Sequence, residues 1–205
     1  MAVKQWNRQN CVAVEMEGHG REELHKAVDI SRTVGWFASI YPIVLETSID
    51  IEEMIIKTKE MLRRIPHHGV GYGVAKHLGQ YEWANVEADL CFNYLGHLDH
   101  ELGANGRIAA SNLSCGSSIP RENISKQSIT MNGSITGGKL RFDVAYNRGR
   151  YSRQSMGQFC QRYIESIKTI VQYCISQEKV VKTASDYGIF DVSQDVLKEL
   201  NDMFN

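Results

Sequence analysis

Apolar and polar side chains alternate over a short stretch near the start of the chain. Every second position from Val12 to Met16 is apolar, whereas Glu15 and Glu17 fall on the opposite side. A period of two residues is typical of a strand with one buried face. We therefore predict a half-buried strand over 12–17 whose polar face ends in the Glu17 carboxylate.

Two further elements are predicted in the region that follows. Gly18 and Gly20 interrupt the alternation, and the polar residues from Arg21 to Lys26 suit a short helix. Val34 to Leu45 is rich in aromatic and β-branched residues, which favour a central strand. Pro42 lacks a backbone donor and marks a bulge or an edge position in that strand.

Two amphipathic helices are indicated by apolar residues at helical spacing. Asp50 followed by Glu53 forms a start that resembles a capping box, and the apolar repeat then continues until Pro66. A longer stripe begins after Ser152 and predicts a helix that covers one face of the sheet. Its members are Met156, Phe159, Cys160, Tyr163, Ile164, Ile167, Ile170, Val171 and Cys174.

Three later segments have strand character. Strands are predicted around Leu90 to Leu95 and over 129–135 and 140–146, the last two joined as a hairpin at Gly137-Gly138. The residues over 103–127 are rich in Gly, Ser and Asn and predict a long surface loop or exposed edge structure.

Composition and charge narrow the class of protein. The chain has 205 residues, of which 42% are hydrophobic and 23% charged, so we expect one domain over 1–205, with 179–205 as a terminal linker and a short helix from Ser193. The formal net charge is -1 and the basic residues are dispersed, which argues against nucleic acid and membrane surfaces as partners. The polar start and the lack of a long apolar run predict a cytosolic protein.

The spacing of the cysteines and histidines does not predict a metal site. The five cysteines include no Cys-x-x-Cys pair and suit reduced, mostly buried thiols. They are Cys11, Cys91, Cys115, Cys160 and Cys174. His97 and His100, with Glu101, come nearest to metal-ligand spacing but lack an evident third ligand, so we expect surface histidines there.

Four motifs follow one another along the chain. They are Glu17-Gly18-His19-Gly20-Arg21-Glu22, the stretch 32–37 continued by Tyr41-Pro42, the glycine-rich stretch 66–73, and Phe92-Asn93-Tyr94-Leu95-Gly96. Together they resemble the signature motifs of epimerization domains of nonribosomal peptide synthetases, which belong to the condensation-domain superfamily. The first hexapeptide marks epimerization domains more than ordinary condensation domains. The tail Thr183-Ala184-Ser185-Asp186-Tyr187 resembles the end of such domains.

The resemblance implies a fold and an incomplete site. The expected fold is an α/β lobe like chloramphenicol acetyltransferase, with a mixed, mainly antiparallel sheet flanked by helices. The N-terminal lobe of the family carries His-His-x-x-x-Asp-Gly, but His67-His68 runs into Gly69-Val70-Gly71-Tyr72 without the Asp. The resemblance therefore implies the C-terminal lobe alone, which would need the missing N-terminal lobe for activity.

The resemblance also implies a substrate and a catalytic residue. The substrate would be an aminoacyl or peptidyl thioester on the phosphopantetheine of a peptidyl carrier protein, in secondary metabolism such as antibiotic biosynthesis, and the lobe itself would bind no cofactor. Inverting an α-carbon needs a base, an acid and stabilisation of the enolate. The family assigns an acid/base role to the position of Glu17. The residues alone leave open that Glu17 pairs with Arg21 or Arg32 and only holds a turn.

Other residues of the motifs receive expected roles. Asn93 and Tyr94 are candidate donors to the thioester oxygen, but strand alternation points them to opposite faces, so one is expected in the core. The candidate substrate-binding residues are Arg32, Trp36 and Tyr41; the two aromatic residues also suit the core or a channel wall. A structural role is expected for His19, Arg21 and Glu22, which would fasten the turn by hydrogen bonds and an ion pair, and for Gly71 and Gly73 in a tight turn.

Two alternatives to an epimerase lobe remain at this point. One is a condensation-domain lobe that forms peptide bonds, which the first hexapeptide disfavours. The other is a lobe without catalytic activity that docks a carrier protein or another synthetase subunit. An apolar face normally covered by the missing lobe also makes self-association a hypothesis.

Overall fold

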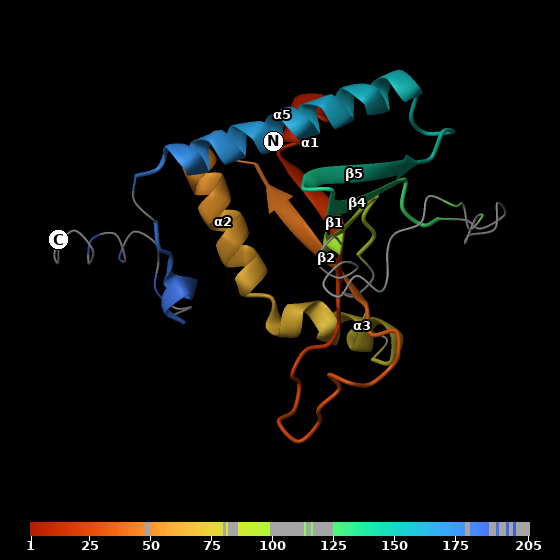
Figure 1. Cartoon of the computed structure of the whole chain (residues 1–205), viewed down its shortest axis with the longest axis vertical. Coiled ribbons are helices and arrows are strands. Elements are labelled where there is room, and N and C mark those ends of the chain that lie inside the picture. Colours follow the sequence, from red (N-terminus) through yellow and green to blue (C-terminus); the bar gives the residue numbers. More distant parts are fainter. Residues whose placement is uncertain are drawn as a thin grey trace.

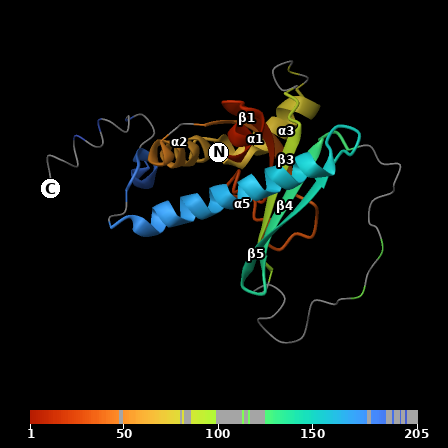
Figure 2. The ribbon, with the colours of Figure 1, turned by 90° about the horizontal axis from the view of Figure 1, so that it is seen from above.

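A sheet and a layer of helices make up the body of the molecule. The computed structural model describes residues 1–47, 50–79, 81, 86–98, 113, 116, 125–178, 181–188, 192, 196 and 199. The long helix α5 (Arg153–Ser176) lies across the strands (Figure 1), and the view from above shows it over the sheet beside α2 (Figure 2). The predicted α/β fold with a sheet flanked by helices is confirmed.

Five described strands form one sheet in the order β2-β1-β3-β4-β5. Their bounds are β1 Cys11–Gly18, β2 Ser39–Glu46, β3 Leu90–His97, β4 Ile129–Thr136 and β5 Lys139–Tyr146. The pairs β1/β2 and β4/β5 are antiparallel, whereas β3 runs parallel to both β1 and β4. The sheet is mixed, as predicted, and most of its residue pairs are antiparallel. The parallel pairs join strands with other elements between them in the chain, as a parallel pair requires, since it cannot be closed by a tight turn.

Side-chain caps fix the starts of the two principal helices. The Asp50 carboxylate accepts a hydrogen bond from the Glu53 backbone N–H at 2.8 Å at the start of α2 (Ile51–Arg63). The Ser152 hydroxyl accepts from the Ser155 backbone N–H at 3.1 Å at the start of α5. Such caps contribute about 1 kcal/mol each. Both helix starts are confirmed.

The hydrophobic core lies between the sheet and α5. Phe159 of α5 and Met131 of β4 are only 1% and 2% exposed. A short helix that periodicity did not predict, α1 (Ala2–Asn7), adds Trp6 to this core. The Trp6 ring lies 5.1 Å from that of Phe159, and its Nε1 donates to the Ser155 hydroxyl at 3.1 Å. The first part of the apolar stripe of α5, from Met156 to Tyr163, therefore packs in the core, whereas Ile164, Val171 and Cys174 are exposed.

The segment between β1 and β2 differs from the prediction. No helix forms from Arg21 to Lys26, and β2 begins at Ser39 rather than Val34, so 19–38 is a loop that extends away from the sheet (Figure 1). The physical reason is that the Arg21 side chain binds carbonyl groups of this loop, which keeps the backbone out of a helix or strand. Val34 in this loop is fully exposed.

Two glycines after α2 lie in a helix and not in the predicted tight turn. Pro66–Gly69 forms the 3-10 turn η1, and Gly71 and Gly73 then lie inside α3 (Val70–His77) instead of a tight turn. A Cβ at either position would have no neighbour within 4 Å. The tight-turn prediction is therefore wrong, because the sharp change of direction occurs before these glycines, at η1.

A short turn near the C-terminus is fastened to α2. Asp186 in η3 (Ala184–Tyr187) accepts hydrogen bonds from Lys59 and from Arg63, the latter at 2.5 Å, and from the Thr183 backbone N–H at 2.8 Å. These donors, Lys59 foremost, hold the pKa of the Asp186 carboxyl well below its usual range. The tail motif thus joins the C-terminal turn to α2.

Some predictions concern residues outside the described ranges. These are most of the loop over 103–127, the terminal helix from Ser193, Cys115, and the pair His100 and Glu101. Among the helices that the structure describes, none is both long enough and apolar enough to cross a membrane.

Candidate acid/base site

The two faces of the sheet differ in polarity. Neighbours in register point to the same face, since side chains alternate along a strand. Val14 and Leu90 are in register, buried, and face the helices. Glu15 and Cys91, one position further along, point to the opposite face. The candidate site lies on this second face.

Glu17 lies next to the end of β1 on that second face. Its neighbour across the antiparallel pair is Ile40, which is 48% exposed. The Glu17 side chain is partly buried and forms no hydrogen bond or ion pair with any residue that the structure describes. The carboxylate is therefore available to a ligand at an open part of the sheet.

The two arginines considered as partners of Glu17 do not neutralise it. The Arg21 guanidinium donates to the carbonyl oxygens of Ile30 at 2.8 Å and Thr33 at 2.9 Å, and stacks 4.2 Å from the Phe37 ring centre. Arg32 is an exposed residue of the same loop. The structure therefore shows no ion pair between Glu17 and either arginine, and the Arg21 side chain holds the loop by hydrogen bonds to its carbonyl groups.

Glu22 joins two histidines into a cluster that we call the Glu22 clasp. One carboxylate oxygen lies 3.2 Å from His19 Nε2 and the other lies 2.8 Å from His68 Nδ1. The backbone N–H of Arg21 donates to His19 Nδ1 at 3.0 Å, so Nε2 is the nitrogen of His19 that donates to Glu22. His19 and Glu22 thus make contacts of the kind expected for residues that fasten the turn. Sequence reasoning missed His68, because its partner is distant in sequence.

The turn that carries His68 has a left-handed backbone. His67 and His68 both have φ near 46°, a conformation that costs L-residues about 1–2 kcal/mol each. Gly69 follows with φ 81°, and a Cβ there would lie 2.1 Å from the Tyr41 ring. Glycine is thus required at 69. The contact fixes Tyr41, whose partner across the strands is Met16, beside Glu17.

A buried thiol lies between the carboxylates of the open face. Burial, with smaller contributions from Glu15 and Glu17, raises the pKa of Cys91 to about 11. Glu15 in turn accepts a hydrogen bond from the Gln127 side chain. Of the two glutamates, Glu15 is therefore held by a neighbour, whereas Glu17 is available.

Asn93 and Tyr94 diverge, as strand alternation predicts. Asn93 follows Cys91 by two residues, so it shares the face of Glu17, and it is partly buried. Tyr94 points the other way and is 48% exposed. The expectation that the second side chain lies in the core is wrong for Tyr94, which lies beside the register shift where β3 leaves its regular pairing with β4.

The three candidate substrate-binding residues are not brought together. Tyr41 packs against the core. Trp36 is 90% exposed and Arg32 is exposed, both in the loop 19–38. The core interpretation is therefore confirmed for Tyr41 and wrong for Trp36, because the Arg21 contacts keep that part of the chain away from the sheet.

The described cysteines and histidines form no metal-binding group. Cys11, Cys91, Cys160 and Cys174 are free thiols, and only Cys91 is buried, so the expectation of mostly buried thiols is wrong for them. His97 is exposed at the end of β3. No group of three potential metal ligands occurs within the described part of the chain.

Comparison with known families identifies the class of the chain. A family model described as "Condensation domain" matches residues 1–188. The chain belongs to the condensation domain family. A crystal structure of the epimerization domain from the third module of tyrocidine synthetase B matches with a TM-score of 0.77 and 32% identity, over 86% of this chain and 40% of that chain. A condensation domain of the enacyloxin polyketide synthase, at 13% identity and a TM-score of 0.53, shares the fold.

The similar curated proteins are peptide synthases. Bacitracin synthase 2 of Bacillus licheniformis is 36% identical over 204 residues, which are 98% of this chain and 8% of that protein. Surfactin synthase subunit 1 of Bacillus subtilis (strain 168) is 35% identical over 211 residues, 100% of this chain and 6% of that protein. The chain is a condensation-superfamily domain of the nonribosomal peptide synthetase type, and it spans less than a tenth of these relatives.

Proposed function

We propose that the chain is the C-terminal lobe of an epimerization domain, which inverts the α-carbon of an aminoacyl or peptidyl thioester from L to D. The observation that carries the proposal is the Glu17 carboxylate, which lies on an open sheet face without an ion-pair partner among the described residues. Its place in the Glu-Gly-His-Gly-Arg-Glu motif and the similarity to the tyrocidine epimerization domain support it.

Glu17 would exchange a proton with the substrate. The thioester makes the α-proton removable, and the carboxylate takes it and becomes a carboxylic acid while the electron pair forms an enolate. An acid on the facing lobe then returns a proton to the other side of the α-carbon. The reverse direction uses Glu17 as the acid. The mechanism needs one acid/base group on each side of the reacting carbon, and only one of the two needs to be a carboxylate.

Asn93 is the candidate donor to the enolate oxygen. Its amide shares the face of Glu17, and an amide N–H can bind an oxygen that gains negative charge. One such donor contributes about 2.7–4 kcal/mol to the stabilisation of an oxyanion. Tyr94 points to the other face, so a role for its phenol requires that the bulged end of β3 turns it toward the cleft.

The Glu22 clasp would keep Glu17 in position. The hexapeptide runs from Glu17 to Glu22, and the clasp ties its far end to η1, which packs on Tyr41 beside the strand end. A base that is held in one place loses less entropy when it reacts. His19, Glu22 and His68 therefore act through the backbone that carries Glu17, not on the substrate.

The proposal needs two partners. A peptidyl carrier protein would deliver the substrate on its phosphopantetheine arm, so the lobe needs no cofactor of its own. An N-terminal lobe would supply the opposite wall of the cleft and the His-His-x-x-x-Asp-Gly motif. Ile40 and Val44, 48% and 53% exposed on the open face, offer apolar surface for that wall.

The test combines the lobe with the N-terminal lobe of a related epimerization domain. A carrier protein loaded with an L-aminoacyl thioester is the substrate, and the D fraction is measured by chiral chromatography after hydrolysis. The mixture is expected to epimerise the substrate, and Glu17→Gln to lower the rate by a factor of about 10²–10⁴. Glu15→Gln, two residues away on the same face, is the matched control and is expected to retain most activity.

Exchange of the α-proton separates the alternatives. In D₂O an epimerase incorporates deuterium at the α-carbon, whereas a condensation domain forms a peptide bond without that exchange. A mixture that binds the loaded carrier but incorporates no deuterium would leave docking as the function and overturn the proposal.

A further inference from the structure

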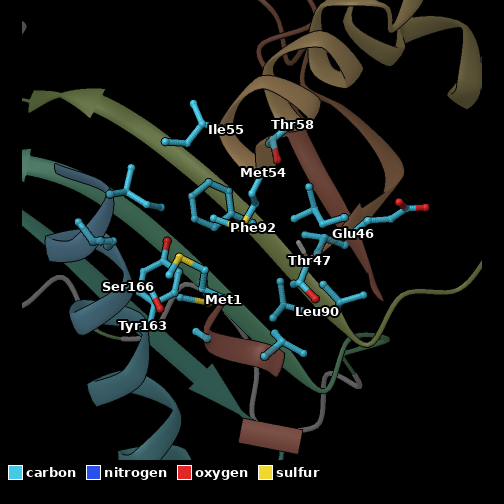
Figure 3. Close-up of a pocket in the computed structure, with 18 of the residues that line it drawn as sticks. Met1, Glu46, Thr47, Met54, Ile55, Thr58, Leu90, Phe92, Tyr163 and Ser166 are labelled. Atoms are coloured by element: carbon cyan, nitrogen blue, oxygen red, sulfur yellow. The ribbon is translucent and has the colours of Figure 1, made fainter. Parts of the chain in front are cut away.

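A cavity of about 550 Å³ lies on the helical side of the sheet, opposite the acid/base site. Leu90 and Phe92 of β3 form its floor, Met54 and Ile55 of α2 form one wall, and Tyr163 of α5 lies on the other side (Figure 3). Met1 and Ala2, the first residue of α1, also line it. The lining is almost wholly apolar, and burial raises the pKa of Tyr163 to about 12.

The helix α5 presents more apolar surface than the described residues cover. Ile164, Val171 and Ile175 are 51%, 48% and 79% exposed. Their spacing of seven and four residues places them in one stripe, adjacent to Ile167 and Ile170, which line the cavity. The cavity and this stripe form a continuous apolar surface, which we call the α2–α5 groove.

The polar groups around the groove do not suit a charged ligand. The Lys59 ammonium is bound to Asp186, and the Ser166 hydroxyl donates to the Arg162 carbonyl oxygen of its own helix at 2.8 Å. Burial lowers the pKa of the Met1 α-amino group, so the margin disfavours charge. Glu46 at the margin would repel an anionic head group. These features favour an apolar polypeptide over a fatty acid.

We propose that the α2–α5 groove binds an amphipathic helix from the part of a condensation-family synthetase that lies outside this chain. The chain covers only 40% of the tyrocidine epimerization domain and 8% of bacitracin synthase 2, so such proteins contain further polypeptide beside the matching region. Two turns of an amphipathic helix present three or four apolar side chains on one face, which suits an elongated apolar groove between two helices.

The segment that directly precedes the matching region in the relatives is the specific candidate. Met1 lines the groove, so a helix that precedes this position in a relative would start at the groove. The inference rests on family membership and on the cavity, and not on Glu17. A failure of the epimerase proposal would therefore leave it standing.

The test adds a synthetic peptide to the full chain. The peptide carries about 20 residues, or roughly 30 Å of helix, that precede the matching segment in bacitracin synthase 2. At about 100 times its dissociation constant we expect the melting temperature to rise by roughly 5–10 °C, with displacement of the dye 1-anilinonaphthalene-8-sulfonate. A peptide of the same composition in scrambled order should have no effect.

Two variants of α2 locate the binding site. Ile55→Glu puts a charge on the wall of the groove and should abolish the effect of the peptide, whereas Ile56→Glu, at the next position outside the lining, should not. No rise in melting temperature with the peptide would overturn the proposal. So would stabilisation by palmitate that Ile55→Glu removes, or a dimer in light scattering that only Ile55→Glu dissociates, since these would identify a lipid or a second copy as the occupant.

Discussion

Replacing Glu22 by Gln should release the loop 19–38 while the rest of the domain stays folded. Hydrogen bonds to a charged group contribute about 1.5–3 kcal/mol each when they are shielded from water. The Glu22 side chain is 15% exposed, but the side chains of His19 and His68 are 69% and 66% exposed. Solvent screening therefore reduces the expected loss for the whole clasp to about 1–2 kcal/mol. That loss raises the open population of the loop roughly 5–30-fold.

Hydrogen-deuterium exchange with mass spectrometry measures this population. Peptides from 19–38 and 66–69 should exchange faster in Glu22→Gln, while peptides from β4 should exchange at the unchanged rate. Glu23→Gln, at the exposed neighbouring position, is the control. His68→Asn keeps a hydrogen-bond donor, and Asn tolerates the left-handed backbone. The exchange rate of its loop should therefore lie between the rates of the unmodified chain and of His68→Ala. Equal exchange of the loop in all variants, or faster exchange throughout α5, would refute the reasoning.

Three further predictions concern stability and reactivity. Phe159→Ala should lower the free energy of unfolding by about 3–5 kcal/mol in urea, whereas Ile175→Ala on the exposed side of α5 should change it by less than about 0.5 kcal/mol. The pKa of Asp186 is lower in the folded than in the unfolded chain, so its carboxylate stabilises the fold above the unfolded pKa of about 3.9. This contribution is lost as pH falls through the folded pKa. The circular dichroism signal of Asp186→Asn should therefore fall less steeply in acid. The raised pKa of Cys91, about 11, stabilises the fold below an unfolded pKa of about 8.5, and that contribution is lost as pH rises toward 11. At pH 8 iodoacetamide should label Cys174 well before Cys91, and equal labelling rates in mass spectrometry would contradict the assigned burial.

The elements that sequence predicted well are those with local determinants. The strand at β1 follows from alternation, the starts of α2 and α5 follow from the caps Asp50 and Ser152, and the β4–β5 hairpin follows from Gly137-Gly138. Each signal lies within a few residues of the element that it specifies. α1 was missed because six residues are too few to display a helical stripe.

The failures have non-local causes. The aromatic and β-branched residues after Val34 predicted a longer strand, but Arg21 binds carbonyl groups more than eight residues away and holds them in a loop. The strand order could not be inferred either, because it depends on where the chain rejoins the sheet after β2 and after β3.

The candidate site shows the same division. Alternation alone placed Glu15 and Glu17 on one face and separated Asn93 from Tyr94. The role of His68 could not be inferred, because its contact with Glu22 spans 46 positions of the sequence. The exposure of Trp36 was also unpredictable, since its composition suits a core and only the path of the loop exposes it.

The outer strands of the described sheet limit how this domain can join other polypeptides. Pro42 lies in β2, at one margin of the sheet, as expected for an edge position, and has no N–H to offer an incoming strand. At the other margin β5 bears the charged residues Lys139, Arg141 and Asp143, which discourage pairing with a further strand. Both edge strands, β2 and β5, are thus poorly suited to pair with an additional strand. Any further polypeptide that binds this domain is therefore expected to pack on the face of the sheet or on its helices, and not to add a strand at either edge.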